Sequence, residues 1–226
     1  MLEPDRPALA ARLRRLDTCA VSDALDGLGL TGAVGGQWVV SNGRRIAGPV
    51  ITVRLGRPGP DRSPRHLCAA AIDAAEPGDV IVVEHGTRDD AAGWGGILSV
   101  AARARGLAGA IIDGAVRDVD ESRRADFPVY ARSVVPMTAR GRVVELDWNE
   151  RVTIAGIEVV PGDLVIADGS GVVFVAASHA LDVIRVAEGI AAREAAMAIA
   201  VRQGRSVSEV MGRTYEDLLT TVRIEK

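Results

Sequence analysis

Hydrophobic and polar residues follow two periods along this chain, and the periods predict an order of helices and strands. Apolar positions that recur every three or four residues predict helices at 7–16, 21–30, 66–75, 96–105 and 178–203. Short apolar runs bounded by Gly and Pro predict strands at 44–55, 79–84, 108–113, 128–131 and 171–176. Between the last two, residues 142–160 alternate in the manner of antiparallel strands, with a turn near Ala155-Gly156.

The centre of the chain joins these elements into one unit. Strand 79–84 leads through a glycine-rich loop to helix 96–105, and strand 108–113 follows directly after Gly106. A unit of this kind has parallel strands and a right-handed crossover. With strands in the middle and helices at both ends, the whole order predicts a layered α/β fold, an α-β-β-α sandwich whose mixed central sheet contains this parallel βαβ unit.

Two segments of the chain resemble each other, EPGDVIVVEHG at 76–86 and VPGDLVIADGSG at 160–171. Each places a Pro-Gly turn before an apolar run, which predicts a type II turn and a buried strand. We interpret them as two similar strand starts and not as a domain duplication. No low-complexity linker divides the chain, so one domain is expected over 1–226, with about 178–226 as a helical extension.

Composition narrows the class of protein. A hydrophobic content of 48% suffices for a full core, and with aromatics at 3% that core must be aliphatic. The net charge of −3 argues against a surface that coats nucleic acid. Cys19 and Cys68 form no disulfide framework, which favours a reduced, cytoplasmic setting. The charged first residues do not predict a signal peptide, and no later run approaches the roughly 18 apolar residues that suggest a membrane span.

The scarcity of lysine excludes one class of chemistry. Lys226, the last residue, is the only lysine in the sequence. A Schiff-base enzyme needs a buried lysine with a lowered pKa, and a chain terminus is a poor place for one. The sequence therefore argues against lysine-dependent aldolase or pyridoxal chemistry.

The strongest candidate for a functional site runs from Gly93 to Asp118. Glycines 93, 95 and 96 precede a helix whose free N–H groups suit a carboxylate or phosphate. A loop with Asp113, Gly114, Arg117 and Asp118 is expected at the same sheet edge, where open α/β sheets place their ligands. Arginine binds carboxylates through two parallel N–H bonds, and aspartate oxygen suits a hard cation. From spacing alone, a role for these residues in rigidifying the loop remains an alternative.

The run GGILSVAARARGLAGAIIDGAVRD, with VSDALDGLG, RIAGPVITV and PGDLVIADGSGVVFV, resembles the family of 4-hydroxy-4-methyl-2-oxoglutarate aldolases and the regulator of ribonuclease activity A. The resemblance implies a swivelling β/β/α-like fold and a Mg²⁺- or Mn²⁺-dependent lyase that releases pyruvate from a 2-oxo acid, with oxaloacetate decarboxylation at the same site. It also implies a homotrimer or homohexamer in which the C-terminal helical extension makes contacts between subunits.

Carried onto this chain, the resemblance assigns a role to each site residue. Asp118 would bind the metal, and Arg117 would bind the 2-oxo acid. Glu194 would complete the site of a neighbouring subunit. The substrate carboxylate would lie on the backbone amides of residues Gly95, Gly96, Ile97 and Leu98.

One position departs from the family pattern. Gly96 stands where aldolase members commonly carry an acid, and Asp89 or Asp90 is a candidate replacement. Two alternatives therefore stay open: a different metal-dependent reaction on a related 2-oxo acid, and a non-catalytic protein that binds a ribonuclease. His66, His85 and His179 share no metal-ligand spacing, and packing is the expected role of Trp94.

Overall fold

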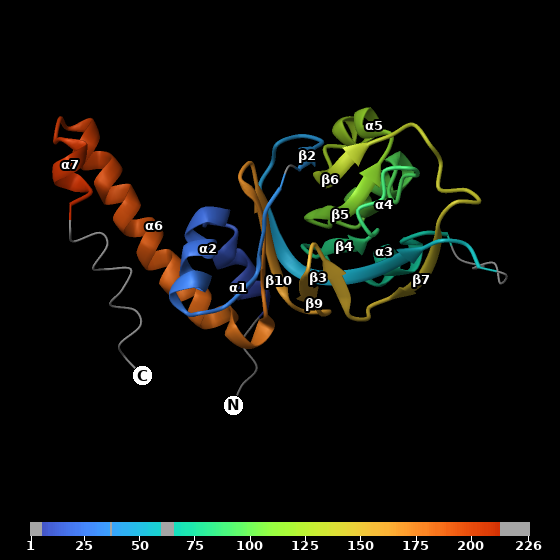
Figure 1. The fold of residues 1–226 in the computed structure, drawn as a ribbon, viewed down its shortest axis with the longest axis horizontal. Helices are drawn as coiled ribbons and strands as arrows, with labels where there is room; N and C mark the ends of the chain where they lie inside the picture. The colour runs from blue at the N-terminus through green and yellow to red at the C-terminus, as the bar shows by residue number, and fades with distance from the viewer. Residues whose placement is uncertain (1–5, 37, 60–65, 213–226) are drawn as a thin grey trace.

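The structure, a computed structural model, describes residues 6–36, 38–59 and 66–212, which form helices and strands in layers (Figure 1). The helices are α1 (Arg6–Leu13), α2 (Thr18–Gly27), α3 (Ala69–Ala74), α4 (Gly96–Ala104), α5 (Val119–Arg124), the short 3-10 helix η1 (Ala177–His179), α6 (Ala180–Arg202) and α7 (Val207–Val210). The strands are β1 (Ala33–Val34), β2 (Val39–Val40), β3 (Ile46–Gly56), β4 (Val80–Glu84), β5 (Gly109–Val116), β6 (Val129–Val134), β7 (Val144–Trp148), β8 (Val152–Ile154), β9 (Ile157–Val159), β10 (Leu164–Asp168) and β11 (Gly171–Val175). This mixed α/β architecture confirms the predicted fold class.

One nine-stranded sheet organises the molecule, in the order β1-β11-β10-β3-β4-β5-β6-β2, with β7 also paired to β3. Strands β3 to β6 are parallel, which confirms the parallel pair β4 and β5 that the βαβ pattern predicted, and β10, β11 and β1 continue the sheet antiparallel. The long strand β3 joins the two halves, because its first residues pair with β10 and Val50–Arg54 pair with β4. Gly48 lies at this junction, where a Cβ would come 2.1 Å from the Gly78 carbonyl oxygen.

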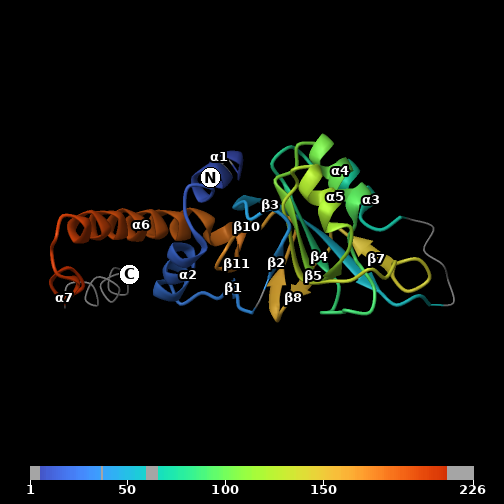
Figure 2. The same ribbon diagram turned by 90° about the horizontal axis from the view of Figure 1, so that it is seen from above.

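Buried apolar side chains form three layers, and these layers cover both faces of the strands. On β4, Ile81 and Val83 face α3 and α4, while Val80 and Val82 face the interior between the two halves of the sheet. Strand β10 divides its side chains in the same way between that interior and the layer of α1, α2 and α6. Because side chains alternate along a strand, both faces of each half-sheet are covered. Figure 2 shows α3, α4 and α5 on one side and α1, α2 and α6 on the other.

Several predicted boundaries differ from those observed, and local contacts give the reasons. Helix α2 begins at Thr18 and not at 21, because the Asp17 side chain accepts a hydrogen bond from the Ala20 amide and caps it. Within the alternating segment 142–160, β7 pairs antiparallel with β3, and β8 pairs antiparallel with β9. The predicted turn at Ala155-Gly156 is confirmed: both residues have positive φ, 48° and 86°, and join β8 to β9.

Helix α6 packs on the body only along its first part. Its buried positions end at Ile190, and Arg12 of α1 holds it there by donating from Nε and Nη2 to the two carboxylate oxygens of Glu188 at 2.9 and 2.8 Å. The second part and α7 extend away from the sheet (Figures 1 and 2). No helix in the described part of the chain is long and apolar enough to span a membrane. Of the predicted extension 178–226, residues 213–226 lie outside the described part.

Candidate active site

The candidate site lies where the carboxyl ends of β4 and β5 meet the N-terminus of α4. Two backbone hydrogen bonds fasten the loop before α4 to the segment after β5: Gly93 donates to the Ala115 carbonyl at 2.8 Å, and Arg117 donates to the Trp94 carbonyl at 3.0 Å. The glycine-rich loop and the Arg117-Asp118 segment are therefore parts of one rigid edge. This arrangement confirms that the βαβ unit brings both segments of the sequence together.

Asp113 does not take part in this edge, contrary to the prediction. Strand β5 continues to Val116, so Asp113 and Gly114 belong to the strand and not to a loop. The Asp113 side chain is 3% exposed, accepts a hydrogen bond from Arg132 Nε at 2.8 Å, and accepts one from the Ala155 amide at 3.1 Å. This carboxylate supports the β8–β9 hairpin, and its role is structural.

Arg117 and Asp118 form the polar centre of the edge. Asp118 adopts the left-handed conformation, with φ 55° and ψ 40°, at the residue that precedes α5. Its Oδ2 forms an ion pair with Arg117 Nε and accepts a hydrogen bond from the Gly96 amide, both at 3.2 Å. Both side chains are about 40% exposed, so they remain accessible to a ligand. Among the described residues, none donates a hydrogen bond to Oδ1.

The glycines before α4 allow this close approach. Gly95 is the N-cap residue and provides no side-chain cap. A Cβ at Gly95 would lie 3.0 Å from Asp118 Oδ2 and 3.6 Å from Arg117 Nε. The amides of Ile97 and Leu98 belong to the same first helical turn, whose N–H groups have no partner within the helix. Backbone donors, one guanidinium and one carboxylate thus meet at a single helix end.

A cleft of about 860 Å³ opens over this helix end. One wall consists of the loop before α4, the first turn of α4 and the Arg117-Asp118 pair. A second wall comes from two segments distant in sequence, which contribute Pro58, Gly59, His66, Leu67, Thr138, Ala139, Arg140, Gly141, Val143 and Val144. Sequence reasoning missed this wall, since neither segment carries a pattern that points to the α4 N-terminus.

The charges that line the cleft favour an anion. Arg117 and Arg140 contribute two guanidinium groups, and His66 contributes an imidazole. Asp118 is the only acidic side chain among the described residues that line it. Arg140 is exposed and forms no ion pair with any described residue. The lining thus offers an anion two guanidinium groups and the first-turn amides of α4.

The donor set fits a hard cation that keeps most of its water. Within the described residues, no group of three or more His, Cys, Asp or Glu side chains is arranged to hold a metal. Asp118 offers one carboxylate whose Oδ1 is free of described hydrogen bonds, beside an open cleft. Magnesium and manganese accept such sites, because Mg²⁺ in particular retains several waters and uses one or two carboxylates. A closed zinc-type site does not fit.

Glu194 is not near this edge within one chain. It lies on α6, which extends from the opposite side of the sheet (Figure 1). Burial, with the charges of Asp17 and Asp23 adding to it, raises the pKa of its carboxyl group. The predicted contribution of Glu194 to a neighbouring subunit stays a prediction.

Asp89 and Asp90, the candidate replacements for an acid at residue 96, do not line the cleft. Asp90 accepts two hydrogen bonds from Arg88, both at 2.8 Å, and these lower the pKa of Asp90 to about 2. Neither Asp89 nor Asp90 is among the described residues that line the cleft. The role of Asp89 or Asp90 as a replacement for an acid at residue 96 stays a prediction.

Trp94 and His85 support the edge from beneath, as the packing interpretation predicted. Trp94 is 2% exposed, stacks on Phe127 with ring centroids 6.2 Å apart, and donates from Nε1 to Ser99 Oγ at 2.9 Å. His85 is buried, and its Nε2 lies 2.8 Å from the Ala91 carbonyl oxygen. Burial is the main cause that lowers the pKa of His85. These rings fix the loop that leads to Gly95.

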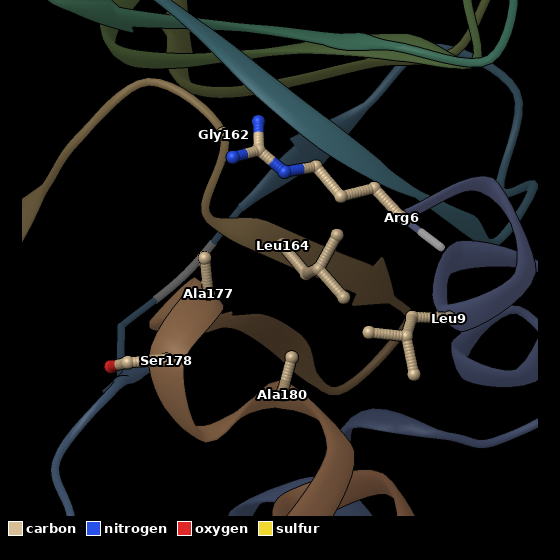
Figure 3. A pocket seen from close by; sticks show the side chains of 7 residues that line it. All are labelled: Arg6, Leu9, Gly162, Leu164, Ala177, Ser178 and Ala180. Carbon is tan, nitrogen blue, oxygen red and sulfur yellow. The ribbon is translucent and has the colours of Figure 1, made fainter. Parts of the chain in front are cut away.

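A second, smaller cavity of about 210 Å³ lies between α1, β10 and the start of α6 (Figure 3). Its lining is mostly aliphatic, and Arg6 is the only charged side chain among the described residues around it. It lies on the α6 side of the sheet, with none of the residues of the candidate site in its lining. The chemistry of the chain is therefore concentrated in the large cleft.

Comparisons with known proteins agree with this geometry. Residues 18–174 match the family model RraA-like, described as Aldolase/RraA. The "Putative 4-hydroxy-4-methyl-2-oxoglutarate aldolase" of Halalkalibacterium halodurans is 30% identical over 163 residues, which cover 71% of this chain and 73% of that protein. Protein DlpA of Legionella pneumophila is 27% identical over 92% of this chain, but the match covers only 34% of DlpA. The chain also spans about half, 56%, of the matched protein of Methanocaldococcus jannaschii.

Solved structures show the same fold. An uncharacterized protein from Pseudomonas syringae has a TM-score of 0.82 and 29% identity, covering 91% of this chain and 98% of that one. Streptomyces coelicolor RraAS2, described as an unusual member of the RNase ES inhibitor RraA protein family, has a TM-score of 0.73 over 91% of this chain and 100% of that one. At 23% identity, this second likeness concerns the fold alone.

Proposed function

We propose, from the premise that this chain belongs to the RraA-like (Aldolase/RraA) family, that it is a divalent-metal-dependent lyase. Its substrate would be a 4-hydroxy-2-oxo acid of the 4-hydroxy-4-methyl-2-oxoglutarate type, cleaved by a retro-aldol reaction that releases pyruvate. The observation that carries the proposal is the meeting of Arg117, Asp118 and the first-turn amides of α4 in one cleft. The aldolase names of the relatives agree with it.

The residues of the cleft divide the task of binding among them. The first-turn amides of Ile97 and Leu98 bind the carboxylate next to the keto group, beside the Gly96 amide that donates to Asp118, where the helix end favours negative charge. Arg117 donates to the keto acid and offsets charge that develops on its oxygen. Asp118 holds Mg²⁺ or Mn²⁺ through its free oxygen. When bound, this cation polarises the keto oxygen and stabilises the enolate of pyruvate.

The second wall of the cleft suits the distal end of such a substrate. Arg140 lies there without an ion-pair partner among the described residues. A second carboxylate, as in 4-hydroxy-4-methyl-2-oxoglutarate, would be bound by Arg140. The same site would decarboxylate oxaloacetate, because that reaction passes through the same enolate.

The decisive measurement is pyruvate release from a panel of 4-hydroxy-2-oxo acids and oxaloacetate, with Mg²⁺, Mn²⁺ or EDTA. We expect turnover with either cation and none with EDTA. Arg117→Ala and Asp118→Ala should each lower kcat/KM at least about 100-fold, because each removes charge stabilisation of the transition state. Asp120→Ala is a matched control on α5, since its side chain is exposed and absent from the cleft lining. Full activity of Asp118→Ala would refute the assigned role.

The rival function is non-catalytic binding of a ribonuclease. We consider it because two solved structures of similar fold are described as inhibitors. No feature of the described chain specifies such a contact. Absence of a metal-dependent product from every acid in the panel, together with ribonuclease capture by the purified protein, would favour this rival over the lyase.

A further inference from the structure

Gly96 lies against a side chain that none of the sequence predictions included, Glu121 of α5. A Cβ at Gly96 would lie 2.7 Å from Glu121 Cβ and 3.1 Å from Glu121 Cγ. Two carbon atoms do not approach to 2.7 Å without a shift of one of them, so Glu121 occupies the space that a side chain at residue 96 would need. The same hypothetical atom would lie 3.2 Å from Asp118 Cβ. Gly96, Asp118 and Glu121 therefore meet at one point.

The Glu121 carboxylate is available for another partner. Its side chain is 52% exposed, and its ion pair is with Arg124 at 2.9 Å, one helical turn along α5. Exposed pairs of this kind contribute little, and the carboxylate can leave Arg124 at small cost. The Glu121 amide donates to the Asp118 carbonyl oxygen at 3.1 Å, which fixes the two residues one turn apart.

Resting on the proposed function, we propose that Glu121 is a positioning carboxylate of the Asp118 site, which accepts hydrogen bonds from the water shell of the cation. Gly96 is then glycine because Glu121 needs its space. A cation held by Asp118 alone would keep several waters, and carboxylates that accept hydrogen bonds from such a shell raise metal affinity. Asp118 is the only acid among the described residues that line the cleft. Glu121 lies against Gly96, the residue next to Asp118 in space.

The test is calorimetric titration of the full-length protein with MnCl₂, without substrate. Glu121→Gln keeps the size of the side chain and removes its charge, and we expect it to weaken Mn²⁺ binding about tenfold or more. The control is Asp120→Asn, an adjacent acid on the same helix that pairs with Arg123 and is 72% exposed; it should bind Mn²⁺ as the wild type does. Equal Mn²⁺ affinity of Glu121→Gln and the wild type overturns the inference.

A relocation variant tests the geometry itself. Gly96→Asp with Glu121→Gly removes the closest contact, because the Cβ of residue 121 is the atom that would lie 2.7 Å from the new Cβ, and it moves the carboxylate from α5 to the first turn of α4. This double variant should bind Mn²⁺ more tightly than Glu121→Gly alone, whereas a merely structural role of Glu121 predicts no recovery. Gly96→Asp should lower the urea midpoint more in the wild-type background than in the Glu121→Gly background, because both side chains compete for one space only when Glu121 is present. If the double variant recovers neither affinity nor stability, the proposed coupling is wrong.

Failure of this inference and failure of the proposed function give different results. If Asp118→Ala loses Mn²⁺ and activity while Glu121→Gln keeps both, the lyase proposal stands and Glu121 is only a helix surface residue. If the wild type binds no Mn²⁺ and releases no pyruvate, the proposed function itself is wrong, and the role of Glu121 is refuted with it.

Discussion

At the scale of single residues, the site depends on backbone positions that few side chains tolerate. Asp118 has a φ of 55°, a conformation that Asp adopts more readily than most residues other than Gly. This conformation turns the chain from β5 into α5 and directs the carboxylate to the Gly96 amide. Gly95 then leaves room for Asp118 and Arg117 to approach the helix end.

Gly95→Ala should therefore impair the site with little effect on stability. The new Cβ would lie 3.0 Å from Asp118 Oδ2, so the exposed carboxylate must move by a few tenths of an ångström. Misplacement of a catalytic group costs about 10- to 100-fold in kcat/KM. Steady-state kinetics and urea unfolding measure the two effects, with Gly169→Ala, which meets no atom within 4 Å, as control. An unchanged kcat/KM would show that the close approach is not needed.

His85 gives a prediction about pH. Burial, the largest cause, lowers the pKa of His85, so the folded state takes up its proton at a lower pH than the unfolded state, where the pKa is about 6.5. The unfolded state binds more protons below that pH, and the free energy of unfolding should fall as pH decreases, by at most about 1.4 kcal/mol per unit. Urea unfolding at pH 5, 6 and 7 should show this dependence in the wild type and in His66→Gln, but weakened in His85→Gln. An equal dependence in all three would contradict it.

At the scale of elements, α4 and α6 differ in how much of the helix packs against the rest of the molecule. Helix α4 buries Leu98, Ser99 and Ala102 and exposes Ile97, as expected for a helix with one face on a sheet. Helix α6 has no buried residue after Ile190, although apolar residues continue to Val201. Its second part is thus stabilised by helix propensity within one chain, or by contacts with other copies.

Gly189→Ala separates these two sources of stability. Gly189 is exposed in the middle of α6, and an added Cβ would meet no atom within 4 Å. Within one chain, Ala should raise the free energy of unfolding by about 0.5–1 kcal/mol, because Gly loses more conformational entropy in a helix. Thermal or urea unfolding measures the change. A lower stability would indicate that this face of α6 is closely packed in an assembly.

At the scale of the whole molecule, α4, whose first turn lines the candidate cleft, and the free part of α6 lie on opposite sides of the sheet (Figure 2). A chain cannot bring its own Glu194 to its own Asp118 in this arrangement. The proposed role of Glu194 therefore requires a second copy in a closed ring, such as a trimer or a hexamer.

Mixing of variants tests the shared site. Asp118→Ala and Glu194→Gln should each be inactive alone. In trimers mixed at equal amounts, about a quarter of the sites would combine an intact Asp118 with an intact Glu194 from the next copy, so roughly that share of wild-type activity should return. Light scattering establishes the oligomeric state of each sample. No recovery in mixed oligomers, or a monomer by light scattering, would exclude a site shared through Glu194.

The sequence by itself determined the parts of this protein that depend on neighbouring residues. Continuous apolar runs after Pro-Gly turns predicted the buried strands β4 and β10, and the βαβ pattern predicted that the loop at Gly95 would meet Arg117 and Asp118. These features follow from local periodicity and from the fixed handedness of a crossover. The family resemblance, confirmed by the comparisons, rested on the same stretch.

Only the tertiary structure decided what distant segments contribute. It moved Asp113 into a buried ion pair with Arg132, supplied Arg140 and His66 as the second wall of the cleft, and placed Glu121 against Gly96. None of these contacts has a sequence signal, because each joins residues whose separation along the chain is set by the order of strands in the sheet. Local patterns fix which element a residue belongs to, whereas the packing of elements decides which side chains meet.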